Sequence, residues 1–182
     1  MKTLEKKWMN LMKKLSLSLF SIILFLSIIT SASSFEKIII GKANVTDGDT
    51  IKINDQKIRL FGIDAPETKQ FCKEVYLSFL IFNFKRDYNC GKKSTNALKK
   101  KIKDKKVRCL IQDNKDRYRR NIGICYLNKQ DINSWLVKNG YAIAYRRYSK
   151  KYIIDEQYAE ENKLGIWQGT FMEPEKWRRI MN

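Results

Sequence analysis

The sequence predicts an α+β domain: a five-stranded β-barrel with about three helices. Five short segments rich in β-branched residues are bounded by turn signals, as expected of strands. Three other segments repeat apolar residues with helical spacing. One of these helices falls between the third and fourth strands, an order that matches a small closed barrel of the OB type. A chain of 182 residues is long enough for one such domain with a substantial core.

The strands are predicted at residues 37–45, 50–53, 57–61, 107–111 and 122–126. Ile38-Ile39-Ile40 forms the apolar part of the first strand, and Ile51 and Ile53 alternate along the second. Asp47-Gly48 is a typical hairpin turn, and Asn54-Asp55-Gln56 marks the next one. The first three strands are therefore expected to form a meander.

The helices are predicted at residues 92–103, 132–139 and 152–163. Ser94 or Thr95 could cap the first, and Asp131 is expected to cap the second. Gly140 is expected to end the second helix in a left-handed conformation. After the third helix and Gly165, Ile166 and Trp167 are expected to pack back against the core.

The segment from Thr68 to Gly91 has the weakest pattern, because apolar and basic residues mix without a clear period. Cys72 and Cys90 lie near its two ends. The segment could form a short helix and a flap near a site, or a surface excursion held by a disulfide; the second interpretation is favoured.

The first 34 residues have the layout of a secretory signal. Lysines are followed by an apolar run from Leu15 to Ile29 and then by small residues up to Ser34. The run is short for a membrane span of about 20 residues, so we predict cleavage near Ser34, with an uncleaved anchor as the alternative. Residues 35–182 are then the exported domain.

The exported part is strongly basic. The leader holds five of the 37 basic residues and one of the 19 acidic ones, which leaves 32 and 18 and a net charge of about +14. Such an excess favours a polyanionic partner, either nucleic acid or an anionic membrane surface. The absence of histidine excludes Ser-His triads, histidine-based ribonuclease chemistry and His-ligated zinc sites. Catalysis must therefore depend on carboxylates, arginines, a metal and water.

The four cysteines, all beyond the leader, predict two disulfides in an oxidising compartment. Their spacing does not suit a zinc site. Three pairings are possible. We predict Cys109–Cys125, which would face each other across two strands, and Cys72–Cys90, which would close a loop.

Two acidic segments are expected to meet at one end of the sheet. The turn Asp47–Thr50 precedes the strand Ile58–Glu67 by one hairpin. This order would bring Asp49 and Asp64 together with Arg59 beside them, which suggests a metal and an anionic substrate. Taken singly, each segment could also be an ordinary polar turn.

Together with Asp116-Arg117-Tyr118-Arg119-Arg120, the runs Val45–Ile51 and Ile58–Glu67 resemble the staphylococcal-nuclease-like (thermonuclease) family. The resemblance extends from about Ile38 to Trp167. It implies a Ca²⁺-dependent nuclease that leaves 3′-phosphates. It assigns the metal to Asp49, Asp64 and the carbonyl of Ala65, catalysis to Arg59, Glu67 and Arg120, and substrate contacts to Arg117, Tyr118, Arg146 and Tyr148. Arg119 stands where the family usually has a glycine.

We therefore interpret the chain as an exported nuclease, periplasmic or secreted, or anchored if the leader stays attached. Its partner is DNA or RNA; no obligate protein partner is implied, and a monomer is expected. An OB-fold module that binds single strands without cutting them is the alternative. A membrane-tethered surface protein without a nucleic-acid role is a third. The acidic residues argue against a pure binding module, because binding a polyanion needs no carboxylates.

Overall fold

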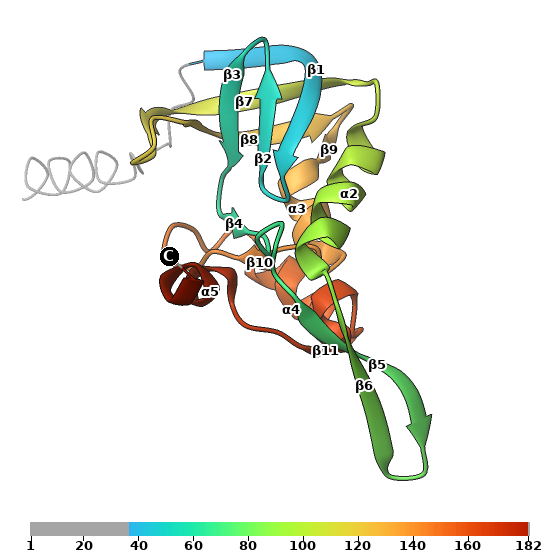
Figure 1. Ribbon diagram of the computed structural model, residues 1–182. Coiled ribbons are helices and arrows are strands. Elements are labelled where there is room, and N and C mark those ends of the chain that lie inside the picture. The colour runs from blue at the N-terminus through green and yellow to red at the C-terminus, as the bar shows by residue number, and fades with distance from the viewer. Residues whose placement is uncertain (1–36, 182) are drawn as a thin grey trace, which may run out of the picture. The chain divides into compact units, whose positions relative to one another are not determined.

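In the computed structural model, which describes residues 37–181, five strands form a closed barrel (Figure 1). The predicted leader lies outside the described residues. The barrel strands are β1 (Lys37–Asp47), β2 (Thr50–Ile53), β3 (Gln56–Leu60), β7 (Lys106–Lys115) and β8 (Asn121–Leu127). They pair in the order β3-β2-β1-β7-β8, and a parallel pairing of β3 with β8 closes the ring. The predicted OB-type barrel is confirmed.

Alternating apolar residues fill the barrel. Ile51 and Ile53 of β2 meet Ile58 and Leu60 of β3 in a core cluster that also contains Val107. Their alternation with less buried polar residues is the pattern of strands with one buried face. The register follows from this pattern, because a shift by one residue would move every isoleucine to the solvent.

Four helices accompany the barrel in the described residues, namely α2 (Cys90–Ile102), α3 (Ile132–Lys138), α4 (Ile153–Glu161) and α5 (Pro174–Met181). The first three correspond to the predicted helices, and α5 is additional. The predicted cap of α2 is wrong: the side chain of Asn89 accepts the cap hydrogen bond, and Ser94 and Thr95 lie inside the helix. Asn89 lies outside the predicted helix because the helix begins two residues earlier than its apolar spacing indicates.

The second helix has the predicted ends. Asp131 caps α3 by accepting a hydrogen bond from the backbone of Ser134. Gly140 has a φ of +67°, and a Cβ there would lie 2.1 Å from the carbonyl oxygen of Leu164. Gly140 thus ends the helix and lets the segment after α4 approach closely.

Short elements connect the barrel to the helices. They are β4 (Ile63–Asp64), β9 (Gln130–Asp131), β10 (Ile143–Ala144), the 3₁₀ helix η1 (Gly165–Gln168) and β11 (Gly169–Thr170). The pairing of β4 with β10 places Asp64 opposite Ile143. This pairing fixes the direction of the chain directly after the barrel strand β3.

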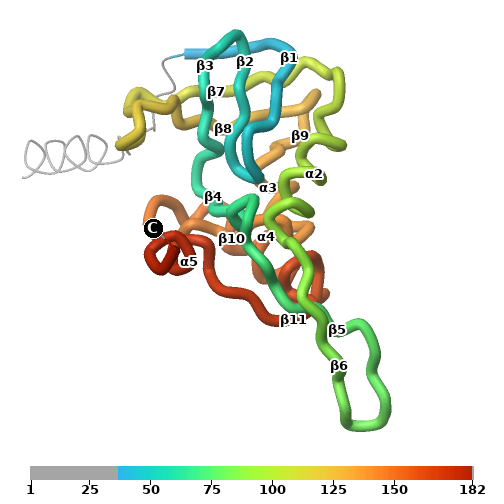
Figure 2. Tube along the Cα trace, in the orientation of Figure 1, coloured from blue at the N-terminus to red at the C-terminus, as the bar shows by residue number. Residues whose placement is uncertain are grey.

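The segment from Thr68 to Gly91, whose sequence shows no clear period, contains a long β-hairpin formed by β5 (Cys72–Phe79) and β6 (Phe82–Tyr88). It projects away from the barrel, as the trace in Figure 2 shows. The disulfide Cys72–Cys90 closes its base, and β11 pairs with Lys73 and Glu74 at the start of β5. The favoured interpretation, an excursion held by a disulfide, therefore describes this segment.

The second predicted disulfide, Cys109–Cys125, joins residues directly opposite each other on β7 and β8. Both disulfides and the core clusters lie within 37–166, and Phe35–Asn182 is a compact unit by itself. A chain that begins at Phe35 therefore keeps the whole described core. Within residues 37–181, no helix is long and apolar enough to cross a membrane.

Candidate active site

Asp49, Arg59 and Asp64 meet at one end of the barrel. One terminal nitrogen of Arg59, Nη1, donates to Asp49 at 2.6 Å, and the other, Nη2, donates to Asp64 at 2.9 Å. Both carboxylates are buried, with Asp49 5% and Asp64 0% exposed. Arg59 therefore bridges two buried acids through both arms of its guanidinium, a geometry that lysine cannot reproduce.

The strand register creates this meeting. Thr50 pairs with Arg59 across β2 and β3, and the backbone of Leu60 donates to the carbonyl of Asp49 at 2.8 Å. Asp49 comes at the end of the Asp47-Gly48 turn, and β4 brings Asp64 back to the same edge. The structure therefore brings Asp49, Arg59 and Asp64 together, as the sequence predicts.

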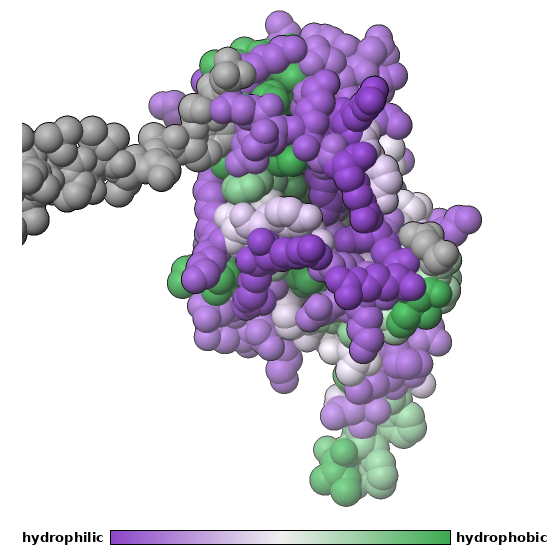
Figure 3. Space-filling model, turned by 90° about the vertical axis from the view of Figure 1, so that its left-hand side faces the viewer, coloured by the Kyte–Doolittle hydropathy of each residue, from purple (hydrophilic) through white to green (hydrophobic). Residues whose placement is uncertain are grey.

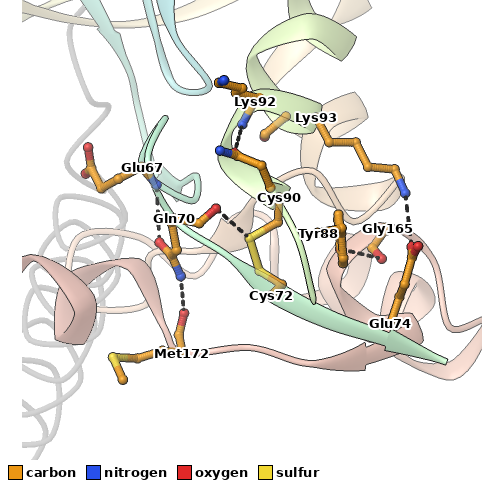
Figure 4. The surroundings of a disulfide bond; sticks show 12 residues. Glu67, Gln70, Cys72, Glu74, Tyr88, Cys90, Lys92, Lys93, Gly165 and Met172 are labelled. Atoms are coloured by element: carbon orange, nitrogen blue, oxygen red, sulfur yellow. Dashed lines mark hydrogen bonds and ion pairs between the residues drawn. A yellow bond between two sulfur atoms is a disulfide. The ribbon is translucent and has the colours of Figure 1, made fainter. Parts of the chain in front are cut away.

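Glu67 lies on the loop after β4, held there by Gln70 (Figure 4). The Gln70 side chain is fully buried, accepts from the backbone N–H of Glu67 at 3.2 Å and donates to the carbonyl of Met172 at 2.7 Å. A Cβ on Gly91 would lie 1.7 Å from the carbonyl oxygen of Glu67, so α2 begins directly against this loop. Gln70 ties the Glu67 loop to the segment that leads into α5.

Arg178 of α5 completes the cluster, and sequence reasoning did not find it. It donates to both oxygens of Asp64, at 3.0 and 2.9 Å, and to Glu67 at 2.8 Å. The three carboxylates Asp49, Asp64 and Glu67 are thus linked by two guanidiniums in one continuous network. The neighbouring Arg179 bonds instead to Glu175 of its own helix.

Arg120 reaches the site through Thr50. Its Nη1 donates to the Thr50 hydroxyl at 3.2 Å, and that hydroxyl donates to Asp49 at 2.9 Å. Its Nε donates to Asp116 at 2.6 Å. The other terminal nitrogen, Nη2, has no hydrogen bond to a described residue, so it is available to a ligand.

The loop before Arg120 keeps a tight turn without the family's glycine. Arg119 has a φ of +61°, the left-handed region in which glycine is favoured. Asp116 accepts hydrogen bonds from the backbone N–H groups of Tyr118 and Arg120. These bonds hold the turn and lower the pKa of Asp116 against the opposing effect of its burial.

The predicted substrate-contact residues lie in two places. Tyr118 is exposed, with the guanidiniums of Arg117 and Arg120 over its ring at 4.8 and 5.3 Å. Tyr148 is exposed and contacts the ring of Tyr145, over which Arg59 lies at 6.0 Å. Tyr118 therefore contacts an arginine of the site directly, and Tyr148 is linked to one through Tyr145.

Arg146 has a structural partner. Its guanidinium lies 2.6 Å from Glu156, a buried residue of α4 that also accepts from the backbone of Ala144 at 3.0 Å. Burial raises the pKa of Glu156, while the Ala144 hydrogen bond and the charge of Arg146 lower it in part. This arrangement does not turn Arg146 toward Asp64 or Glu67.

Replacing Arg146 with alanine is expected to cost about 1 kcal/mol of stability near neutral pH, because the buried carboxylate of Glu156 loses its half-exposed cationic partner. Loss of its charge raises the pKa of Glu156 further. A carboxyl group whose pKa is higher in the folded state than in the unfolded state contributes stability at pH values below its unfolded-state pKa. This contribution is lost as the pH rises through the folded-state pKa. The deficit should therefore be small at pH 4 and grow toward pH 7 in denaturant titrations. A deficit independent of pH would contradict this account.

The electrostatics of the cluster favour a cation. Burial raises the pKa of Asp64, and the charge of Asp49 adds to this, while the two arginines act in the opposite direction. Burial likewise raises the pKa of Glu67, against the hydrogen bond from Arg178. Burial disfavours the charged guanidinium of Arg59, yet Asp49 and Asp64 outweigh it and raise its pKa.

The donor set fits a hard divalent cation in type and charge. Asp49 and Asp64 supply carboxylate oxygens, and the backbone N–H of Ala65 lies 3.4 Å from Asp49. No described residue donates a hydrogen bond to the carbonyl of Ala65, which leaves it available as a ligand. No cluster of three or more acidic, cysteine or histidine side chains forms a metal site within residues 37–181, so a metal here needs backbone or water ligands as well.

One signal in the sequence could have identified the helix that carries Arg178. Pro174 followed by Glu175 and two arginines near the end is a typical short helix with favourable charges at both termini. The partner of that helix, however, lies 114 residues earlier in the chain. No local pattern reveals such a contact.

Comparison with known proteins gives a consistent result. The family described as "Staphylococcal nuclease homologue" matches residues 57–169. An "Uncharacterized endonuclease" of Haemophilus influenzae is 34% identical over 86% of this chain and 82% of its own length. The "Thermonuclease" of Staphylococcus intermedius is 33% identical over 68% of this chain and 73% of its own.

The "Succinoglycan biosynthesis protein ExoI" of Rhizobium meliloti is 36% identical over 71% of this chain. The match spans 65% of that protein. The family match covers more than half of the chain and includes Arg59, Asp64, Glu67 and Arg120, whereas Asp49 and Arg178 lie outside the matched residues. This chain therefore belongs to the staphylococcal nuclease family of enzymes.

Proposed function

We propose that the protein is an exported, Ca²⁺-dependent nuclease that hydrolyses phosphodiester bonds of DNA or RNA and leaves 3′-phosphates. One observation carries the proposal: Asp49, Arg59 and Asp64 form a hydrogen-bonded cluster beside Arg120, and Arg178 links Glu67 to it through Asp64. Carboxylates gathered in a basic protein suit hydrolysis of a polyanion better than simple binding. The two disulfides, Cys72–Cys90 and Cys109–Cys125, support an oxidising, exported location.

The arginines act on the phosphate. Arg120 is anchored by Asp116 and Thr50 and has Nη2 available for a phosphate oxygen. Arg59 is held in place by its two carboxylates. A guanidinium cannot lose its proton under these conditions, so both residues stabilise the charge that develops at phosphorus.

Glu67 is the proposed general base. One of its oxygens accepts from Arg178, and the other has no hydrogen bond to a described residue. Burial raises its pKa toward the working range of a base that must accept a proton from water. Gln70 fixes the backbone from which this carboxylate projects.

Ca²⁺, when bound, would neutralise phosphate charge and help position the attacking water. The residues that would hold it are Asp49, Asp64 and Ala65, through oxygen atoms alone. This donor set disfavours zinc and suits Ca²⁺, which accepts irregular shells more readily than Mg²⁺.

A basic cleft offers a path for the rest of the substrate. It has a volume of about 580 Å³ and lies beside Arg120, lined by Lys37, Lys52, Lys57, Lys115, Tyr118 and Arg119 among others. Lysines bind the phosphate backbone without reading sequence. Exposed Tyr118 can stack on a base. This supports cleavage with little sequence preference.

The test is cleavage of labelled DNA and RNA by purified residues 35–182. Activity should disappear with chelator, return with Ca²⁺ and return only weakly with Mg²⁺. Products should resist 3′ extension until a phosphatase removes the terminal phosphate. Glu67→Gln, purified identically, controls for contaminating nucleases. Full activity in chelator would reject the metal, and binding without cleavage under all conditions would favour the OB-fold binding module.

A further inference from the structure

The tip of the β5–β6 hairpin is the largest apolar feature of the described surface that the nuclease site does not use. Leu80 and Ile81 are 86% and 87% exposed, and exposed aromatic side chains follow on both strands: Tyr76, Phe79, Phe82 and Phe84. In Figure 3 this apolar group covers the projecting end of the molecule, and the surface above it is mainly hydrophilic. Exposure on this scale usually marks an interaction site.

The sequence of the tip is unusual for a turn. Leu80-Ile81 forms a two-residue connection, and Leu80 has a φ of +52°. Glycine or asparagine normally occupies such a position, because a side chain there is strained. Folding alone would favour a polar turn, so the two large aliphatic residues indicate a role outside the fold.

The chemistry of the hairpin favours an apolar medium over nucleic acid. The ten residues from Val75 to Phe84 carry no charge, in a chain of which 31% of residues are charged. A surface for DNA or RNA needs cations among its aromatic residues. The Ser78 hydroxyl donates to Asn83 at 2.7 Å, so these two polar side chains already satisfy each other.

Charged residues begin directly beyond this uncharged part, toward the base of the hairpin. Arg86 pairs with Glu74 and Lys73 with Asp87, while Lys85 has no ion-pair partner among residues 37–181. The exported part as a whole has a net charge of about +14. An apolar tip that projects from a basic body matches a bilayer whose surface is anionic.

We propose that this hairpin tip inserts into the interfacial layer of an anionic phospholipid bilayer and so docks the protein on membranes. The hairpin suits this role because β5 and β6 satisfy each other's backbone across the turn, with Phe79 paired to Phe82. The Cys72–Cys90 disulfide holds its base. The hairpin tip projects away from the barrel and from β4, which carries Asp64, so docking through the tip does not require contact with that strand (Figure 2).

The test measures flotation of residues 35–182 with vesicles of phosphatidylcholine, alone or mixed with phosphatidylglycerol. The variant Leu80→Gly with Ile81→Asn keeps a favourable hairpin turn and removes the apolar tip. It should bind mixed vesicles at least about tenfold more weakly. The control Ile40→Ser with Ile154→Ser removes two exposed isoleucines elsewhere and should bind like wild type. Cleavage of a short oligonucleotide should be equal in all three proteins.

A second measurement locates the tip. Ile81→Trp should show a blue-shifted emission and quenching by brominated lipid, relative to the unsubstituted protein, only with anionic vesicles. Equal flotation of wild type and turn variant would overturn the proposal, because charge alone would then explain binding. The proposal would also be overturned if the wild-type protein did not bind vesicles. A wild-type dimer that the turn variant abolishes would point to self-association instead, and a loss of oligonucleotide binding in the turn variant would point to a nucleic-acid contact; either result would overturn the proposal.

Discussion

Replacing Arg59 with lysine is expected to lower the maximal rate of cleavage by about 10²–10³-fold, the usual effect of removing one transition-state donor. Lysine keeps the charge but cannot donate to Asp49 and Asp64 at once, as Arg59 does at 2.6 and 2.9 Å. Attraction to a polyanion depends mainly on charge, so DNA affinity should change only about two- to threefold.

Single-turnover cleavage and DNA affinity, measured on the same preparations, separate these effects. Arg108→Lys is the matched control, because Arg108 is an exposed residue of β7 outside the cluster. Glu67→Gln should likewise lower the rate by about 10²–10⁴-fold with affinity retained, since it removes the base but no cation. Equal losses of rate and affinity in Arg59→Lys would show that Arg59 acts in binding and not on the transition state.

The barrel could be predicted because short segments of the sequence specify its elements. Alternating isoleucines indicate β2, Asp47-Gly48 indicates a turn, and Asp131 indicates the start of a helix. These local patterns also bring Asp49 close to Arg59 and Asp64, since only one hairpin separates Asp49 from the other two.

The hairpin and α5 could not be predicted in the same way. The apolar residues of β5 and β6 face solvent, so they lack the alternation that core packing imposes on a strand. Arg178 bonds to Asp64, 114 residues earlier, and Gln70 ties the segment before α5 to the Glu67 loop through Met172, 102 residues away in sequence. Contacts of this range leave no trace in periodicity.

Replacing Arg178 with alanine is expected to have opposite effects without and with Ca²⁺. Without the metal, Asp64 loses two hydrogen bonds, and one arginine remains for two buried carboxylates. Removing one partner of a buried ion pair costs about 3–5 kcal/mol. The Arg178 side chain is 23% exposed, so we expect a loss of about 2–3 kcal/mol in the free energy of unfolding.

With Ca²⁺, the same change removes a cation that occupies the carboxylates the metal would bind. Calorimetry should therefore show Ca²⁺ affinity about tenfold tighter in Arg178→Ala than in wild type, which corresponds to 1.4 kcal/mol. Saturating Ca²⁺ should then reduce the deficit relative to wild type by about 1.4 kcal/mol, because a ligand bound only to the folded state stabilises it in proportion to the logarithm of its affinity. Arg179→Ala is the matched control: Arg179 is its exposed neighbour and pairs with Glu175, so its loss should change stability by less than about 0.5 kcal/mol. Unchanged or weaker Ca²⁺ affinity in Arg178→Ala would show that the guanidinium and the metal do not compete for Asp64.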